Sequence, residues 1–442
     1  MSRIAVIGGG AAGMMAAIRA LELGAEVTLY EKNEKLGKKI YITGKGRCNV
    51  TNDCEPDVFF THVTGNAKFL YSAYYAFDPW AVQKMLTDAG CPLKVERGNR
   101  VFPVSDHSSD VIKVLRKKLE DSGCEIRYKT EVKKLLAEEL NAELSEDSKA
   151  PEEGKEKKKN KSGKGYERRI TGLVTAEGKK HFYDAVIVTT GGLSYPSTGS
   201  TGDGYRFVKD FGLEIKEPVP SLVPLETMET WAHHLQGLAL KNVTATLELD
   251  EKKVYSQMGE LLFTHFGVSG PLVLTASCEL ARKTGAGKKM LYLDLKPALN
   301  AEQFDKRLLR EFEVANNKQI KNVLPAIYPV RLAEVMLSLA EIDGAKAVHS
   351  ITREERERLV CLTKKLPLTI IGTRDFNEAI ITCGGISLKE VNPSTMEAKK
   401  VKGLYCAGEV LDLDAHTGGF NLQIAWSTGY LAGESAAEQI YE

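Results

Sequence analysis

The first 31 residues contain the pattern that most restricts how this chain can fold. Residues 3–7 (RIAVI) are typical of a buried strand, and GGGAAG at 8–13 follows directly with the spacing GxGxxG. A helix is expected over 14–23, and a second strand over 26–30 (EVTLY) closes on Glu31. Glycine is needed where the chain turns tightly and where a Cβ would block a phosphate, and a helix N-terminus favours anions. The pattern therefore predicts a Rossmann-like βαβ unit that binds a dinucleotide.

Glu31 restricts which dinucleotide this unit can hold. It lies 18 residues after Gly13, within reach of an adenosine ribose 2′-hydroxyl. A carboxylate at this point disfavours the additional phosphate of NADP. The motif by itself leaves FAD and NAD open, and a glycine-rich turn without a ligand is the alternative.

A second polar loop follows at residues 38–52 (KKIYITGKGRCNVTN). Gly44 and Gly46 permit unusual backbone angles, and Arg47 and Asn49 bring hydrogen-bonding groups into the same short loop. We expect this loop to fold over the phosphates and the reactive ring of the dinucleotide. The alternative is an ordinary surface turn.

The C-terminal part repeats the combination of a strand, a glycine turn and a helix. A strand over 403–407 ends at Gly408 and Glu409, and a helix is expected from the Gly-Gly pair at 418–419 to residue 432. A second helix N-terminus directed at the ligand suits a flavin, because its positive end stabilises the anionic reduced ring. Glu409 could bind ribityl hydroxyls. An ordinary capped helix is the alternative.

Composition excludes several other classes of protein. The 442 residues include 60 Lys plus Arg against 59 Asp plus Glu, so the net charge of +1 gives no reason to expect a nucleic-acid partner, although a local basic patch remains compatible with it. Eight cysteines without a CxxC pair or a Cys/His cluster predict reduced thiols, no metal site and a cytoplasmic protein. The sequence contains no run of 18 uncharged apolar residues, so no membrane-spanning helix is expected. The oligomeric state is not indicated.

The middle of the chain divides into segments of different periodicity. Two similar apolar segments that end in Gly-Gly, 185–192 and 379–385, are interpreted as the points where the chain leaves and re-enters the nucleotide domain. Between them, 213–297 alternates as strands and 301–365 has helical periodicity. Residues 146–169 contain no Ile, Leu, Val, Met or Phe, which predicts a flexible loop.

Several longer motifs carry a resemblance to a known family. They include GKGRCNVTN at 44–52, TTGGLSYPSTGSTGDGY at 189–205, GELLFTHFGVSGP at 259–271 and GLYCAGEVLD at 403–412. The chain resembles the BaiN-type, aminoacetone-oxidase-like NAD(P)/FAD-dependent oxidoreductases, which belong to the superfamily of two-dinucleotide-binding-domain flavoproteins. The resemblance extends nearly from end to end and implies an α/β fold, in which a Rossmann-like FAD-binding domain is interrupted by a β-barrel-like domain carrying a small helical domain. The expected boundaries are 1–195 and 373–442 for the FAD-binding domain, 196–299 and 365–372 for the β-rich substrate domain, and 300–364 for the helical domain.

The resemblance also implies which residues line the FAD. Glu31 would bind the ribose, Val132 would meet the adenine through its backbone, and Asn421 and Leu422 would lie beneath the ring. The full set of expected cofactor-binding residues is Gly8, Gly10, Ala11, Ala12, Gly13, Glu31, Lys32, Lys39, Gly46, Arg47, Cys48, Asn49, Thr51, Val132, Thr190, Gly191, Gly192, Gly408, Glu409, Asp412, Gly419, Asn421 and Leu422.

The expected reaction is reduction of a C=C bond conjugated to a carbonyl group. The resemblance implies a small-molecule substrate of the 3-oxo-Δ4 or Δ4,6 steroid or bile-acid type, with hydride delivered from reduced flavin. Tyr195, His265 and His416 are the candidate proton donors, and each could equally make a structural hydrogen bond. Cys48 could be redox-active beside the flavin, but its tight loop favours simple packing.

Two other functions stay open from the sequence. One is a flavin amine oxidase of the aminoacetone type that produces peroxide, and the other is a tRNA-associated flavoprotein, which the near-zero net charge disfavours. No second GxGxxG is present, so NAD(P)H would act only as a transient electron donor.

Overall fold

The first and last parts of the chain fold together. The structure, a computed structural model, describes residues 1–140, 165–283 and 287–438. It divides into two compact units, one formed by Met1–Val219 with Ile381–Glu442 and the other by Pro220–Ile380. The finer division of 220–380 into a β-rich and a helical domain stays a prediction. Most of the expected flexible loop, 146–164, lies outside the described residues, whereas Arg168 and Arg169 already belong to a strand.

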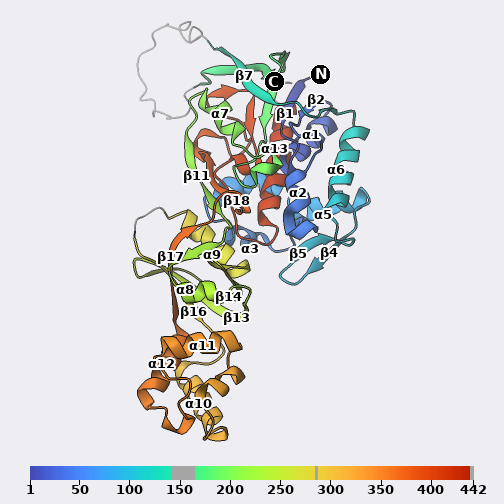
Figure 1. The fold of residues 1–442 in the computed structure, drawn as a ribbon. Coiled ribbons are helices and arrows are strands. Elements are labelled where there is room, and N and C mark those ends of the chain that lie inside the picture. The colour runs from blue at the N-terminus through green and yellow to red at the C-terminus, as the bar shows by residue number, and fades with distance from the viewer. Residues whose placement is uncertain (141–164, 284–286, 439–442) are drawn as a thin grey trace, which may run out of the picture. The chain divides into compact units, whose positions relative to one another are not determined.

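The first unit is built on a parallel sheet in the order β20-β10-β1-β2-β6 (Figure 1). Its strands are β1 (Arg3–Ile7), β2 (Glu26–Tyr30), β6 (Glu125–Arg127), β10 (Ala185–Val188) and β20 (Leu404–Cys406). Nearly every residue of β1, β2 and β10 is buried, as expected for parallel strands that are covered on both faces. The predicted Rossmann-like sheet is therefore confirmed.

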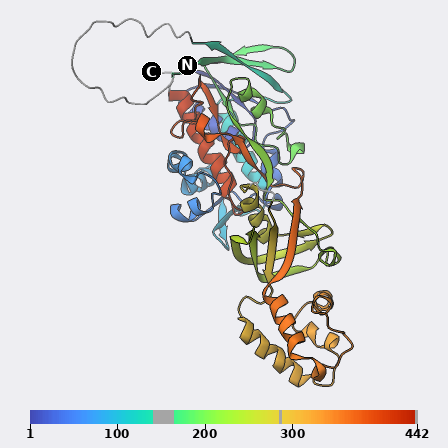
Figure 2. The ribbon, with the colours of Figure 1, turned by 90° about the vertical axis from the view of Figure 1, so that its left-hand side faces the viewer.

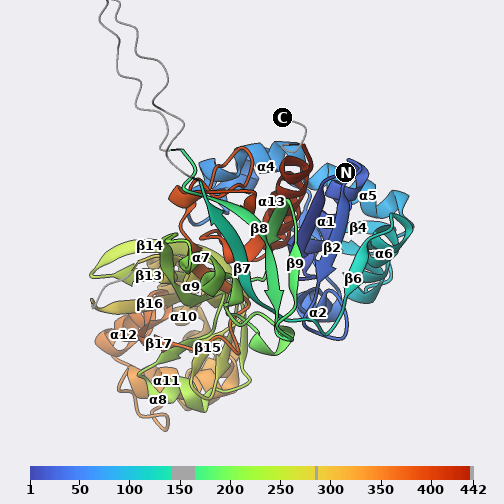
Figure 3. The same cartoon turned by 90° about the horizontal axis from the view of Figure 1, so that it is seen from above.

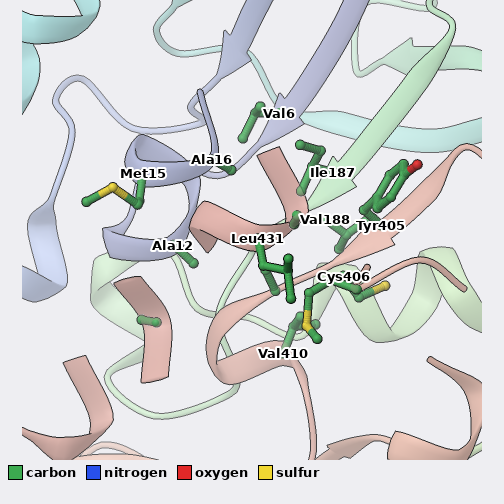
Figure 4. Packing of buried hydrophobic residues seen from close by; sticks show 14 of the residues in the cluster. Val6, Ala12, Met15, Ala16, Ile187, Val188, Tyr405, Cys406, Val410 and Leu431 are labelled. Atoms are coloured by element: carbon green, nitrogen blue, oxygen red, sulfur yellow. The ribbon is translucent and has the colours of Figure 1, made fainter. Parts of the chain in front are cut away.

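Two helices from opposite ends of the sequence pack against each other beside this sheet. Helix α1 (Ala11–Glu22) starts inside the glycine motif rather than after it, and α13 (Phe420–Glu438) runs beyond the expected end at 432. A Cβ added at Gly433 would overlap with the carbonyl oxygen of Ala16. Figure 4 shows Ala16 on the α1 side of this contact and Leu431 on the α13 side. The two backbones therefore touch, which only glycine on α13 permits.

Smaller elements complete the first unit. Its other helices are α2 (Lys38–Ile42), α3 (Pro56–Thr61), α4 (Tyr71–Ala76), α5 (Pro79–Asp88), α6 (Ser108–Asp121) and α7 (Asp203–Lys209). A hairpin of β4 (Leu93–Glu96) and β5 (Arg100–Pro103) pairs with β3 (Thr51–Asn52). A further sheet joins β19 (Val401–Lys402), β8 (Arg168–Thr175), β7 (Val132–Glu139) and β9 (Lys180–Phe182).

The Gly-Gly pair at 384–385 differs from the expectation. It lies inside strand β18 (Ile381–Ile386), which pairs with β11 (Ile215–Ser221) and not with the central sheet. The apolar pattern of 379–385 indicated a strand correctly, but pattern alone does not show which neighbour a strand pairs with.

The second unit contains a closed antiparallel barrel (Figure 2). The order is β12-β15-β14-β13-β16-β17, and the strands are β12 (Leu225–Thr227), β13 (Ala239–Leu249), β14 (Lys252–Thr264), β15 (Gly267–Ser269), β16 (Lys289–Asp294) and β17 (Leu366–Thr373). Its helices are α8 (Thr230–His234), α9 (Pro271–Ala281), α10 (Ala301–Val314), α11 (Val330–Leu339) and α12 (Arg353–Lys364). Closure leaves the sheet without open edges. The predicted inserted barrel is confirmed.

The helical part of this unit shares its core with the barrel. Leu247 and Leu291 of the barrel and Phe304 and Leu308 of α10 belong to one continuous cluster of buried side chains. No described helix in either unit is long and apolar enough to cross a membrane.

The contact between α1 and α13 leads to a prediction about stability. Replacing Gly433 by valine is expected to lower the free energy of unfolding by about 3 kcal/mol, because the new side chain would force the two helix backbones apart. Urea unfolding followed by circular dichroism measures the change. The control is Glu438→Val at the exposed end of the same helix, where a change within about 0.5 kcal/mol is expected. Equal stability of the two variants would contradict the contact.

Candidate functional site

The turn between β1 and α1 has the geometry that a phosphate requires. Gly8 has φ +106, and a Cβ added at Gly13 would overlap with the carbonyl oxygen of Gly8, so the helix starts hard against the strand. Gly10, at the helix N-cap, has no atom near the position of a Cβ, and no side chain caps the helix. Backbone N–H groups of Ala11 and Ala12 in the first turn are therefore available to an anion in open space.

Glu31 is fixed beside this turn. Its carboxylate is buried, and Oε2 accepts a hydrogen bond of 2.9 Å from the Gly9 N–H. Oε1 accepts from the Asn33 backbone N–H at 2.8 Å and from Asn33 Nδ2 at 2.7 Å. Oε2 accepts only the bond from Gly9 among the described residues and keeps a further lone pair, so the carboxylate can accept from a ribose hydroxyl at the end of β2.

A cavity of about 490 Å³ opens next to Glu31. Its lining includes Asn33, Glu131 and Thr175. Thr175 pairs with Val132 across β7 and β8, and its buried Oγ1 has no hydrogen-bond partner among the described residues. A cavity of this size with an unsatisfied hydroxyl beside Val132 fits the adenine that the resemblance places there.

Lys32 contributes to the same cavity but its charge is already engaged. Its Nζ donates to Asp203 Oδ2 at 2.6 Å and to Thr201 Oγ1 at 2.7 Å. The interaction joins the end of β2 to the start of α7, so Lys32 fixes a wall of the cavity.

A polar network holds Glu409 in a defined orientation. Glu409 Oε2 accepts from Lys39 Nζ at 2.5 Å, and Oε1 accepts from Ser194 Oγ at 2.6 Å and from the Thr382 N–H at 2.9 Å. Thr382 Oγ1 in turn accepts from the Ser194 N–H at 3.0 Å. A Cβ at Gly192 would overlap with the Thr382 side chain, which explains glycine at this position. These hydrogen bonds, one of them from the Lys39 ammonium group, hold the Glu409 carboxylate aligned for ligand hydroxyls.

Ser194 and Thr382 were not predicted from the sequence as site residues. Both side chains are completely buried. The signal available in the sequence was a polar residue close to a Gly-Gly pair: Ser194 follows the pair at 191–192, and Thr382 precedes the pair at 384–385. The neighbouring Gly191 has φ +72, and Thr190 Oγ1 accepts from the Gly204 N–H at 3.1 Å.

The loop at 44–52 is held by two different sets of contacts. Arg47 donates to Glu96 and Asp106 and lies 4.2 Å over the Phe102 ring, so its guanidinium is engaged by the β4–β5 hairpin and by the turn that follows it. These two carboxylates raise the pKa of Arg47. Gly46 has φ +85 and open space around it. In this structure Arg47 therefore stabilises the loop rather than presenting its charge to a ligand.

The remaining residues of the loop lie against the start of α13. Thr51 Oγ1 donates to Gln423 Oε1 at 2.6 Å, and a Cβ at Gly419 would overlap with the Thr51 carbonyl group. Asn49 Oδ1 is buried without a hydrogen-bond partner among the described residues. An orphaned acceptor beside the predicted ring site fits a cofactor N–H group.

Asn421 and Leu422 have different roles at the start of α13: Asn421 makes hydrogen bonds to the preceding turn, and Leu422 packs against the core. Asn421 Oδ1 accepts from the Ala415 N–H at 2.9 Å and its Nδ2 donates to the Ala415 carbonyl oxygen at 2.7 Å, so the side chain clamps the turn before α13. Leu422 is partly buried against the core. Asp412 lies at the other end of the turn, where its N–H donates to the Ile386 carbonyl oxygen at 3.0 Å.

The three candidate proton donors lie in different units: Tyr195 and His416 belong to the first unit and His265 to the second. His416 is 9% exposed, and its ring meets His62 edge-on at 5.5 Å. Tyr195, with φ +51, directly follows Ser194 of the Glu409 network in the same unit. His265 is exposed after β14 in the other unit, where its ring contacts Phe266 at 4.9 Å.

Tyr205 is a further candidate that sequence reasoning missed. It ends the segment TGDGY, and its buried hydroxyl has no hydrogen-bond partner among the described residues. Burial, with the charges of Glu409 and Asp412, raises the pKa of Tyr205 well above its ordinary value. The phenol therefore stays a neutral donor beside the Glu409 network.

Cys48 is completely buried at φ +60, and burial raises the pKa of its thiol to about 12. We predict that iodoacetamide at pH 8 leaves Cys48 unmodified in the folded protein, because the thiolate is the reacting species. The exposed Cys361 on α12 is the internal control and should be alkylated. Peptide mass spectrometry reads both sites, and modification of Cys48 at the rate of Cys361 would assign it a reactive role.

The described residues thus fit FAD in several independent respects. They provide an open helix N-terminus, a carboxylate at the end of β2, a cavity beside Val132 and unsatisfied buried groups at Asn49 and Thr175.

Comparison with known sequences agrees with this site. The family model described as the HI0933-like protein Rossmann domain matches residues 2–155 and 148–435. The 3-dehydro-bile acid delta(4,6)-reductase of Clostridium scindens is 30% identical over 453 residues, covering 99% of this chain and 100% of that protein. The ribosomal RNA dihydrouridine synthase of Haemophilus influenzae is 28% identical over 437 residues, covering 98% of each chain. The enzyme of the same name from Escherichia coli is 28% identical over 426 residues, covering 96% of this chain and 95% of that one.

Solved structures share the fold at low sequence identity. The 3-ketosteroid delta1-dehydrogenase from Sterolibacterium denitrificans has a TM-score of 0.51 at 14% identity, covering 99% of this chain and 100% of that one. The 3-ketosteroid-delta4-(5alpha)-dehydrogenase from Rhodococcus jostii RHA1 has a TM-score of 0.50 at 14% identity, covering 99% and 97%. With the family match over most of its length, the chain belongs to the HI0933-like family of FAD-dependent Rossmann-fold oxidoreductases, as the BaiN-type resemblance predicted.

Proposed function

We propose that the protein reduces a C=C bond conjugated to a carbonyl group. The observation that carries this proposal is the chemistry shared by relatives that align over nearly the whole chain. A delta(4,6)-reductase of a 3-dehydro-bile acid acts, by its name, on double bonds conjugated to the 3-carbonyl. A dihydrouridine synthase saturates the C5–C6 bond of uridine, which is conjugated to the 4-carbonyl. Both reactions add one hydride and one proton across an electron-poor double bond.

The chain's own residues divide the task of holding the cofactor. When bound, FAD supplies the hydride. The N-terminus of α1 would bind the pyrophosphate and Glu31 the ribose, while the backbone of Val132 would meet the adenine. Glu409, aligned by Lys39 and Ser194, would bind the ribityl hydroxyls.

A proton must reach the carbon next to the carbonyl group. Of the three candidates, His416 has the environment that best suits this task. It is nearly buried, and its backbone N–H is fixed by the His62 carbonyl oxygen at 2.9 Å. The half-buried ring of His62 packs edge-on against the His416 ring and fixes its orientation. Tyr195 and His265 stay alternatives.

Two substrate classes follow from the relatives. The first is a 3-oxo-Δ4 or Δ4,6 steroid of the bile-acid type, supported by the Clostridium scindens enzyme. The second is a uridine in RNA, supported by two ribosomal RNA dihydrouridine synthases. NAD(P)H would reduce the flavin transiently, since the sequence has no second GxGxxG.

The proposed reaction is tested with the purified protein, loaded with FAD and reduced anaerobically by NADH or NADPH. A 3-oxo-Δ4,6 bile acid or a uridine-containing RNA is expected to restore the absorbance of oxidised flavin, with the saturated product identified by mass spectrometry. The matched controls are the fully saturated 3-oxo bile acid and RNA in which dihydrouridine replaces uridine, because neither has the double bond. Reoxidation by neither substrate, together with bleaching by aminoacetone and peroxide formation in air, would replace the proposal with an amine oxidase.

The cofactor role of Glu31 gives a separate prediction. Glu31→Gln is expected to raise the FAD dissociation constant about tenfold to a hundredfold, because a charge-assisted acceptor is lost at the ribose. Fluorescence titration of the apoprotein with FAD measures it. Glu26→Gln, at the exposed start of the same strand, should leave the constant unchanged. Unaltered FAD affinity in Glu31→Gln would remove Glu31 from the site.

A further inference from the structure

One face of the sheet formed by β19, β8, β7 and β9 is open to solvent. Figure 3 looks down onto β7, β8 and β9. The strand register sets which residues share this face: Leu136 lies opposite Gly172, and Gly172 lies opposite Phe182. Residues that alternate with them, such as Leu135 and Leu173, are buried in the core. The outer sheet face thus consists of Lys134, Leu136, Glu138, Arg169, Gly172, Val174, Lys180, Phe182 and Lys402.

An apolar stripe crosses the centre of the outer sheet face. Phe182 is 58% exposed, and Leu136 and Val174 are half-buried. Gly172 lies between Phe182 and Leu136 and is itself buried. Because Phe182 is still 58% exposed, much of its ring surface is accessible to solvent.

Basic side chains lie on both sides of this stripe. On one side, Lys134 and Lys180 pair with Val174 from the two neighbouring strands. On the other side, beyond Gly172, Arg169 pairs with Lys402. All four are exposed, and none makes an ion pair with a described carboxylate. Glu138, opposite Arg169, is the single acidic residue of the face. Four cations against one carboxylate give a local excess of positive charge that the net charge of +1 conceals.

Single-stranded RNA has the chemistry that complements this arrangement. Its bases stack on exposed aromatic rings, and its phosphates follow lysine and arginine side chains along the same surface. Successive rows of a sheet on one face are about 7 Å apart, so neighbouring phosphates can meet cations on both sides of Phe182. An acidic protein would satisfy the charges but has no need of an exposed ring between them.

We propose that the outer sheet face binds a single-stranded segment of RNA, with a base on Phe182 and phosphates on Lys134, Arg169, Lys180 and Lys402. The inference rests on the proposed function in its uridine form, because the face would hold the RNA that carries the reduced base. Two relatives that align over 98% and 96% of this chain are ribosomal RNA dihydrouridine synthases, which favours RNA over other polyanions.

The test measures binding of a fluorescein-labelled 12-nucleotide oligouridylate to the FAD-loaded full chain by anisotropy. Replacing the four cations by glutamine is expected to weaken binding at least a hundredfold at about 0.1 M salt and to reduce the slope of log Kd against log salt by about three. Phe182→Ala should weaken binding about tenfold without changing that slope. The matched control replaces four other exposed lysines by glutamine and should bind as the unmodified protein does: Lys68, Lys113, Lys241 and Lys389.

The possible outcomes distinguish failure of the proposed RNA-binding face from failure of the proposed reduction. Unfolding temperature and bound FAD must be unchanged in every variant, and reduction of a small enone gives the reference activity. Equal loss of oligouridylate binding in the fourfold variant and in its control would overturn the surface, as would tighter, Phe182-dependent binding to phosphatidylglycerol vesicles or to an acidic peptide. If the oligouridylate binds through this face but neither uridine nor enone is reduced, the surface stands and the proposed reaction fails. Uridine reduction that is identical in the fourfold variant overturns the surface and leaves the reaction standing.

Discussion

The backbone contact between α1 and α13 is the constraint on which the rest of the first unit depends. Gly433 allows α13 to touch the carbonyl group of Ala16, and Gly408 brings the turn after β20 against Ala12 of α1. Helices from the two ends of the chain are therefore in direct contact beside one sheet. The unit can be interrupted by the long insert between them because this contact, and not chain continuity, fixes the position of α13.

Close packing at this contact places two glycine turns around one region. The turn after β1 presents open backbone N–H groups, and the turn after β20 presents Glu409, whose carboxylate is held by Lys39, Ser194 and Thr382. Those partners come from widely separated parts of the sequence. A buried network of this kind is stable only when every member is satisfied, so it fixes the segments as much as it aligns the carboxylate.

Charge is distributed unevenly over a chain that is neutral as a whole. The cations near the site, Lys32 and Lys39, are neutralised by Asp203 and Glu409, which leaves a polar but balanced environment. The cations of the outer sheet face have no such partners among the described residues. The expectation of no nucleic-acid partner rested on the sum of charges, and a sum does not show where they gather. Two relatives are ribosomal RNA dihydrouridine synthases, so binding of RNA to this chain is a question for the binding experiment.

The sequence alone determined the strands of the βαβ unit and the glycine turn at Gly8, because these depend on residues that are neighbours in the chain. The same local pattern placed Glu31 beside this turn. The longer motifs indicated the family and, through the resemblance, the barrel. Only the tertiary structure decided that β18 pairs with β11, that Arg47 turns to the β4–β5 hairpin, and that Thr382 and Tyr205 lie beside Glu409. The physical reason is that hydrogen bonds and charges act between side chains brought together by packing, and sequence separation carries no record of that distance.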